Sequence, residues 1–159
     1  MKTWKDSLHD GLRPGTLAGL FSGAVLALRG RAELGKPLAP LNAPSHWVWG
    51  DHALQQDGLS LRYTALGVLI HQASAVMWGV LYERYLARPR PSPLLELRDA
   101  AVATAAAATV DFALTPKRFT PGFERRLSVA SLVLVYAGFA AGVALGSHRV
   151  RRLKPARRS

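Results

Sequence analysis

The feature of this sequence that most restricts its fold is the separation of charged residues from apolar ones. Four apolar runs, residues 15–28, 64–82, 100–116 and 127–147, cover 71 of the 159 residues and contain only one of the 31 charged side chains, Asp111. A transmembrane helix needs about 20 predominantly apolar residues, because the hydrocarbon core of a bilayer is about 30 Å thick. The pattern therefore argues against a soluble basic domain, although the net charge is +11. It predicts an integral membrane protein.

The expected fold class is all-α, a four-helix transmembrane bundle with a short interfacial helix at the N-terminus. Residues 1–159 form a single membrane domain in this interpretation, because the length leaves little room for a second one. Trp4, Leu8 and Leu12 recur every four residues before the first span, which is typical of a helix lying on the membrane surface. The expected spans are approximately residues 12–30, 62–84, 95–115 and 124–147, followed by a basic tail at 148–159.

The first apolar run has a second interpretation, which is a cleaved signal peptide. Its 14 residues fit the apolar region of such a peptide, and Val25-Leu26-Ala27 resembles a cleavage site. Against this, Asp6 and Asp10 dilute the positive charge that should precede the run. We therefore expect a retained helix, with the signal peptide as the alternative.

The distribution of lysine and arginine predicts the orientation. The N-terminus, the connection between the second and third spans, and the C-terminal tail lie on one side and carry 13 basic residues, against 8 on the other side. The positive-inside rule then places both termini in the cytoplasm. Six basic residues of the tail also predict binding to anionic lipid at the bilayer surface. We expect no nucleic-acid partner, because the tail has no aromatic residues on which bases could stack.

Glycines recur every four residues in the first and fourth spans, and this spacing lets helix backbones approach closely in a membrane. Both sets lie toward the ends of the spans that carry the chain termini. We therefore predict direct packing of the first helix on the fourth, with a homodimer formed by one of the glycine ridges as the alternative. The glycines of the two ridges are Gly15, Gly19 and Gly23, and Gly138, Gly142 and Gly146.

Two ionisable residues, His71 and Asp111, stand out within the apolar runs, and such residues in a membrane usually face the bundle interior. At 1.5 Å per residue, His71 lies about 10 Å and Asp111 about 6 Å below the same membrane surface. They form a candidate intramembrane polar pair, acting either as a hydrogen-bonded clamp between helices or as a proton-handling or ligand-binding site. Tyr136 lies about 200° around its helix from Gly138, toward the third helix or lipid, and is left out of this site.

The loop after the first span contains possible metal ligands, His46, Asp51 and His52. Their spacing matches no established metal motif, and Trp47 and Trp49 more simply anchor the loop at the membrane interface. We therefore predict neither a metal nor another cofactor. The sequence also lacks a phosphate-binding loop, a dinucleotide fingerprint and a hydrolase elbow, so we do not expect an enzyme.

Two segments, residues 42–51 (NAPSHWVWGD) and 114–124 (LTPKRFTPGFE), carry a resemblance to other proteins. They resemble uncharacterised small bacterial inner-membrane proteins that have no assigned activity. The resemblance implies a multi-pass protein of the bacterial inner membrane, and it implies no mechanism.

The expected function is a non-catalytic structural or assembly component of a membrane complex. The lipid bilayer, another membrane protein or a second copy of the chain are the expected partners. The alternative is a small transporter or ligand-binding membrane protein that uses His71 and Asp111.

Overall fold

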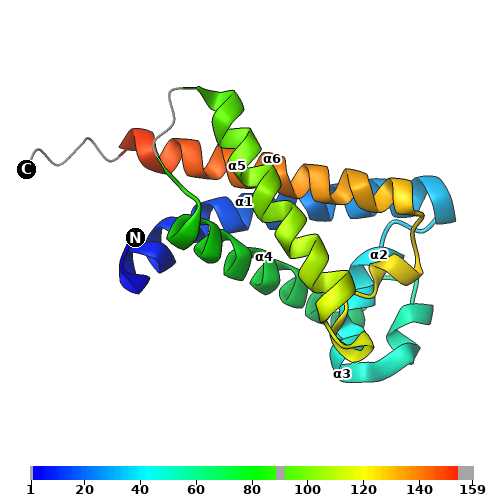
Figure 1. Cartoon of the computed structure of the whole chain (residues 1–159). Coiled ribbons are helices and arrows are strands. Elements are labelled where there is room, and N and C mark those ends of the chain that lie inside the picture. Colours follow the sequence, from blue (N-terminus) through cyan, green and yellow to red (C-terminus); the bar gives the residue numbers. More distant parts are fainter. Residues whose placement is uncertain (1, 89–91, 154–159) are drawn as a thin grey trace, which may run out of the picture.

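The computed structural model describes residues 2–88 and 92–153, and within these ranges it describes side chains up to residue 148. Every regular element in the described part of the chain is helical, which confirms the all-α prediction. Three long helices lie side by side, and a fourth, α5, crosses them obliquely (Figure 1). The long helices are α1 (Trp4–Leu34), α4 (Leu66–Tyr85) and α6 (Val129–Leu153), and α5 spans Pro93–Thr109.

The two ends of the bundle differ in what they carry. The start of α1 and the end of α6 lie at one end, which we call the terminal end (Figure 1). The opposite end, the loop end, is covered by short helical segments that precede α4 and α6. These segments are α2 (Ala39–Asn42), η1 (Ala43–Ser45), α3 (His46–Trp49), η2 (Gly50–Gln55), η5 (Lys117–Phe119) and η6 (Phe123–Arg125).

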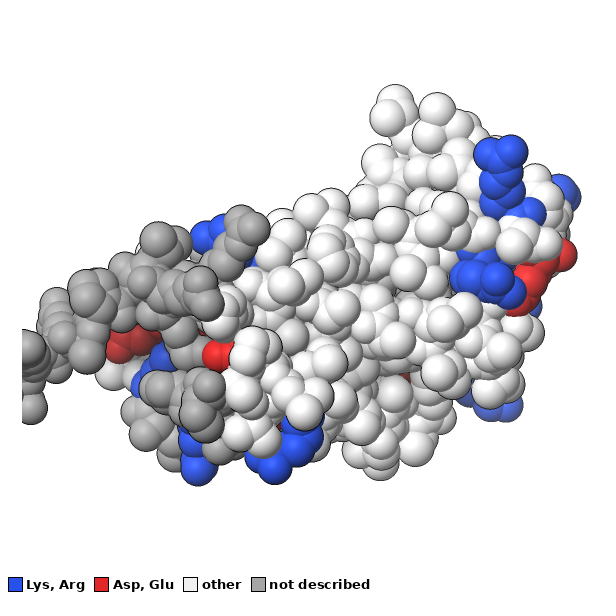
Figure 2. Space-filling view, turned by 90° about the horizontal axis from the view of Figure 1, so that it is seen from above, with Lys and Arg blue, Asp and Glu red and all other residues white. Residues whose placement is uncertain are grey.

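Within the described residues, three helices are long and apolar enough to cross a membrane: Trp4–Leu34, Leu61–Tyr85 and Val129–His148. The second of them begins with a π-helical turn, η3 (Leu61–Ala65), that runs directly into α4. In the space-filling view, acidic and basic side chains gather at the two ends and leave an uncharged band between them (Figure 2). This arrangement indicates a membrane protein, because an uncharged band suits the hydrocarbon core and charged ends suit water and headgroups.

The predicted interfacial helix is not a separate element. One helix of 31 residues, α1, begins after Thr3, whose hydroxyl accepts a hydrogen bond from the Asp6 backbone N–H at 3.1 Å. It continues through Pro14 and ends at Gly35, where φ is +67°. The apolar stripe predicted near the N-terminus lies on the outer surface, and Trp4 is 56% exposed. The stripe therefore extends the apolar face of a spanning helix.

The α6 helix begins at Val129, five residues later than predicted. Its first turn is held by side chains, because the Ser131 N–H donates to the Ser128 hydroxyl at 3.3 Å. Glu33, near the end of α1, accepts a hydrogen bond from the Ser128 N–H at 2.9 Å. A carboxylate at this position satisfies an otherwise unpaired helix N–H and complements the positive end of the helix dipole. The polar contact thus ties α1 to the start of α6.

On one face, α1 approaches α4 at backbone distance. A Cβ atom added at Gly15 would lie 2.5 Å from the Cα of Val76, and one added at Gly11 would lie 2.5 Å from the Cα of Val80. The glycine of α4 at this crossing, Gly79, has equally little room, because its Cβ would lie 2.5 Å from the Gly15 nitrogen. Only glycine fits at these positions without moving a helix.

On a second face, α1 approaches α6. A Cβ atom on Gly142 would lie 2.5 Å from the Cα and the nitrogen of Ala18, and one on Gly146 would meet the backbone of Pro14. Gly138 has more room, since its nearest neighbour would be a side-chain carbon of Val25 at 3.1 Å. The α6 glycines therefore pack on Pro14 and Ala18.

The predicted contact between α1 and α6 exists, but the expectation that one glycine ridge packs on the other is wrong. Gly15 and Gly19 face α4, where Gly19 adjoins the side chain of Gln72. One residue turns a helix by about 100°, so Pro14 and Ala18 lie on a different face from Gly15 and Gly19. The α1 helix lies between two neighbours and needs small residues on both faces.

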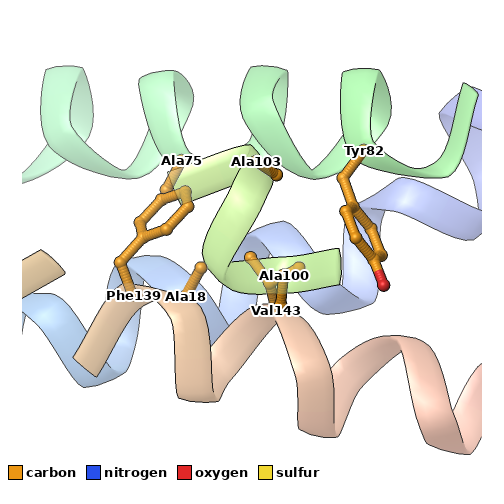
Figure 3. Packing of buried hydrophobic residues seen from close by; sticks show 7 residues of the cluster. All are labelled: Ala18, Ala75, Tyr82, Ala100, Ala103, Phe139 and Val143. Atoms are coloured by element: carbon orange, nitrogen blue, oxygen red, sulfur yellow. The ribbon is translucent and has the colours of Figure 1, made fainter. Parts of the chain in front are cut away.

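The core at the terminal half contains small side chains and few large ones. Phe139 and Val143 of α6 meet alanines of three other helices, and Tyr82 of α4 lies in the same cluster (Figure 3). Alanines bring α5 close to α6, whereas α5 makes far less contact with α4. This leaves a space between α4 and α5 toward the loop end. The alanines of the cluster are Ala18, Ala75, Ala100 and Ala103.

Polar contacts hold the helices together at the terminal end. Lys2 forms ion pairs with Asp10 of α1, at 3.0 Å, and with Glu83 of α4. Burial alone would lower the pKa of Lys2, but the hydrogen bonds to Glu83 and Asp10 outweigh it and raise that pKa above 10.5. The Ser147 hydroxyl of α6 also donates to Glu83. The buried Glu83 carboxylate thereby connects the N-terminal segment, α4 and α6. The predicted basic tail at 148–159 lies largely outside the described side chains, which end at His148.

Candidate functional site

The space between α4 and α5 forms a pocket of about 200 Å³, and it contains both predicted intramembrane residues, His71 and Asp111. Residues of α4 and of the last turns of α5 form its sides. Residues of α1 and α6 form its back, and the loop end covers it. The lining side chains are Ser22, Pro44, Trp47, Ile70, His71, Ser74, Ala75, Met77, Trp78, Ala107, Val110, Asp111, Thr115, Phe119, Pro121, Phe123, Val135, Tyr136 and Phe139.

Asp111 lies where α5 changes into a π-helical turn, η4 (Val110–Leu114). Its carboxylate accepts a hydrogen bond from the hydroxyl of Tyr136 at 2.6 Å. The ring of Tyr136 is also held edge-on by Phe112, with 5.6 Å between ring centroids. Asp111 is half-buried, and a carboxylate withdrawn from water is costly unless it is hydrogen-bonded, so this contact from α6 stabilises the polar residue in η4.

His71, on α4, is held by hydrogen bonds to α1. Its Nε2 lies 3.2 Å from the carbonyl oxygen of Gly19 and 3.0 Å from the hydroxyl of Ser22, which itself donates to the Ala18 carbonyl at 2.7 Å. A carbonyl oxygen can only accept, so Nε2 carries the hydrogen. The neutral ring then has Nδ1 as its acceptor, and none of the hydrogen bonds among the described residues uses that atom.

The structure places His71 and Asp111 in one pocket but does not pair them. Among the hydrogen bonds and ion pairs of the described residues, none joins the two side chains. His71 bonds to α1, and Asp111 bonds to Tyr136 of α6. The pairing prediction is therefore corrected to two separate polar groups that face a shared cavity.

Tyr136 belongs to the site, whereas the sequence predicts a site without it. The predicted direction, about 200° from Gly138 toward the third helix, agrees with its contact with α5, and Asp111 is the residue it meets there. The signal that could have identified it was a tyrosine in the middle of an apolar span. A buried tyrosine hydroxyl needs a partner, and the only carboxylate in the apolar runs was the obvious one.

We call the loop-end segments that cover the pocket its roof, and one backbone carbonyl joins them. The roof residues that line the pocket are Pro44, Trp47, Phe119, Pro121 and Phe123. The oxygen of Thr120 accepts hydrogen bonds from Nε2 of His46 and from Nε1 of Trp47, both at 2.8 Å. Close packing at this point requires Gly122, which has φ of +85° and whose Cβ would lie 2.8 Å from the His46 ring. These contacts join the segment after α1 to the segment before α6 above the cavity.

Asn42 anchors the same roof to the start of the second span. Its amide nitrogen donates to the carbonyl oxygens of Gln56, at 2.9 Å, and Gly58, at 3.0 Å. Its amide oxygen accepts from the Thr64 hydroxyl at 2.7 Å. The side chain is fully buried, so satisfying both of its polar atoms fixes the fold of this segment.

The candidate metal ligands His46, Asp51 and His52 do not form a metal site in the described part of the chain. His46 is 1% exposed and donates to Thr120, whereas Asp51 pairs with Arg125 at 3.0 Å on the surface. Across the described residues, no group of three histidine, aspartate or glutamate side chains could hold an ion. His46 has the structural role of fixing the roof.

Ion pairs connect the segments at the outer edge of the roof. Asp57 binds Lys36 and also Arg126, the latter at 2.5 Å. The hydrogen bonds from Lys36 and Arg126 hold the pKa of Asp57 below its ordinary value of 3.8, although burial acts in the opposite direction. The carboxylate is therefore charged at neutral pH and connects the end of α1 to the segment that enters α6.

Comparison with known protein families, with curated proteins and with solved structures finds no match to this chain.

The contact between Tyr136 and Asp111 can be tested by Tyr136→Phe. Removing the hydroxyl leaves the half-buried carboxylate without its donor, so we expect the free energy of unfolding to fall by about 1–3 kcal/mol. Tyr63→Phe is the matched control, because no hydrogen bond of the described residues uses the Tyr63 hydroxyl. Reversible unfolding in mixed micelles measures both variants. Equal stability of Tyr136→Phe and the control would contradict a supporting role for the contact.

Proposed function

We propose that this chain is a four-span membrane protein that binds a small, largely apolar ligand in the pocket between α4 and α5. The observation that carries the proposal is the pocket itself, which combines apolar and aromatic walls with a few polar groups from different helices. This composition is typical of small-molecule sites, in which apolar area supplies affinity and a few polar groups fix orientation. His71, Asp111 and Tyr136 are the polar groups that would orient the ligand.

The fourth span in this proposal is α5 together with η4. The helical path runs from Pro93 to Leu114 without a break, and this length approaches what a bilayer crossing needs. Charged residues lie near both ends, with Glu96 and Asp99 at the start and Lys117 after the end. Such a crossing supports a position for Asp111 within the membrane.

We further propose that the protein lies in the bacterial inner membrane with both termini cytoplasmic. The excess of basic residues on the side of the termini supports this orientation. The position of α1 at the centre of the bundle supports a retained helix rather than a cleaved signal, because Leu26, within the possible cleavage site, is fully buried.

The orientation can be tested with single cysteines, for which the natural chain offers a cysteine-free background. His52 is exposed at the loop end, and Lys5 is exposed at the terminal end. In intact bacterial spheroplasts, we expect a membrane-impermeant maleimide to label His52→Cys and not Lys5→Cys. After permeabilisation, both should be labelled. The reverse pattern in intact spheroplasts would contradict the proposed topology.

The structural or assembly role expected from the sequence is the second candidate. It is supported by apolar side chains on the outer surface of α5, such as Leu97 and Val102, which are 43% and 53% exposed and could contact lipid or another protein. Ligand binding is preferred because lipid alone accounts for exposed apolar residues, whereas it does not account for a pocket with three polar groups. Neither role is catalytic, in keeping with the absence of catalytic motifs in the sequence.

The ligand-binding proposal can be tested by filling the pocket. Ser74 lines the pocket on α4, and the adjacent Ala73 is exposed on the outer surface and does not line it. Wild type, Ser74→Leu and Ala73→Leu would each be purified in mild detergent and analysed by native mass spectrometry.

We expect wild type and Ala73→Leu to carry a small bound molecule and Ser74→Leu to lose it, because the larger side chain occupies its space. An empty wild type, or equal loading of all three proteins, would contradict ligand binding. A second polypeptide at fixed stoichiometry would favour the assembly role.

A further inference from the structure

Among the residues that line the pocket, Asp111 is the only aspartate, glutamate, lysine or arginine, and this restricts the chemistry of the ligand. We propose that the pocket binds a lipophilic organic cation, with the carboxylate of Asp111 as its counter-charge. This inference rests on the pocket being a ligand site, as proposed above, and adds the class of ligand.

The first observation is a carboxylate without a positive partner. The Asp111 side chain receives a hydrogen bond from Tyr136, and it takes part in none of the ion pairs of the described residues. No lysine or arginine is among the residues that line the pocket. A charged carboxylate in an apolar setting is costly unless an opposite charge accompanies it. A cationic ligand would supply that charge.

The second observation is another carboxylate nearby. Glu124, in η6 at the loop end, directly follows Phe123, whose side chain lines the pocket. One of its carboxylate oxygens is buried and has no hydrogen-bond partner among the described residues. Both acidic groups favour positive charge in the cavity and disfavour an anionic ligand such as a fatty acid.

The third observation concerns the remaining lining. Nε2 of His71 is already bonded to the Gly19 carbonyl, which leaves Nδ1 as an acceptor and gives the ring no further hydrogen to donate. The aromatic rings in the lining attract an organic cation through their electron-rich faces, an interaction worth about 0.5–2 kcal/mol for each well-placed ring. They are Trp47, Trp78, Phe119, Phe123, Tyr136 and Phe139.

The apolar lining also excludes a bare metal ion or a small hydrated cation. Such ions need several oxygen or nitrogen ligands, and no suitable cluster exists among the described residues. An organic cation suits the site because its apolar body fills the cavity while its charge faces Asp111. The ligand would be smaller than a drug-sized molecule, because pockets for drug-sized ligands measure about 300–1,000 Å³ and this cavity measures about 200 Å³.

The test uses two probes of the same shape. Benzyltrimethylammonium is a cation, and neopentylbenzene replaces its nitrogen with carbon and is neutral. Binding would be measured by equilibrium dialysis against the protein in phosphatidylcholine nanodiscs, with empty nanodiscs subtracted to remove partitioning into lipid.

Asp111→Asn removes the charge but keeps an oxygen that accepts from Tyr136. Asp51→Asn is the matched control, because it removes the same charge from an exposed position at the loop end that does not line the pocket.

We expect wild type and Asp51→Asn to bind the cation more tightly than the neutral probe, and Asp111→Asn to bind the cation at least about tenfold more weakly. If Asp111→Asn fails to fold, the comparison of the two probes on wild type decides the question. Equal binding of both probes, unaffected by Asp111→Asn, would overturn the cation inference and leave the ligand pocket standing. Binding of neither probe, together with an empty wild type in native mass spectrometry, would overturn both.

Discussion

The close approach of α1 to two helices at once is the constraint on which the rest of the structure depends. Gly15 meets the backbone of α4 at Val76, while Ala18 meets the backbone of α6 at Gly142. Lipid offers little hydrophobic driving force for helix association, so van der Waals contact between small residues must hold the spans together. With α1 packed against both of them, α4 and α6 make little direct contact with each other. The α5 helix then packs on α6 through alanines and leaves a cavity on its other side, toward α4.

The loop end completes this cavity and makes it a defined site. Thr120 receives two side-chain donors from the segment after α1, and Asn42 ties the same segment to the start of the second span. These hydrogen bonds are buried or partly buried, and a buried polar group that loses its partner costs about 1–3 kcal/mol, so they favour a single arrangement of the roof. His46, a candidate metal ligand in the sequence, takes part in these hydrogen bonds and has a structural role.

The sequence alone predicts the helical class and the approximate positions of the apolar segments. It also identifies His71 and Asp111 as unusual residues within those segments. These features follow from local composition and from helical periodicity. The neighbours of each residue could not be derived in the same way. Periodicity assigns residues to a common face, but it does not say which helix that face meets, and α1 has small residues on two faces about 100° apart. Tyr136 was excluded for this reason, although its predicted direction agrees with its contact with Asp111.

The central claim is that α1 packs at backbone distance in the middle of the bundle, and Gly15→Ala with Gly23→Ala tests it most directly. The two glycines are eight residues apart on the same helix, but a Cβ at Gly23 would have its nearest neighbour at 3.8 Å, against 2.5 Å at Gly15. The measurement is the free energy of unfolding of both variants in mixed micelles. We predict a loss of about 1–3 kcal/mol for Gly15→Ala from overpacking, and no loss for Gly23→Ala, because alanine favours a helix by about 1 kcal/mol over glycine. Equal stabilities of the two variants would contradict the account.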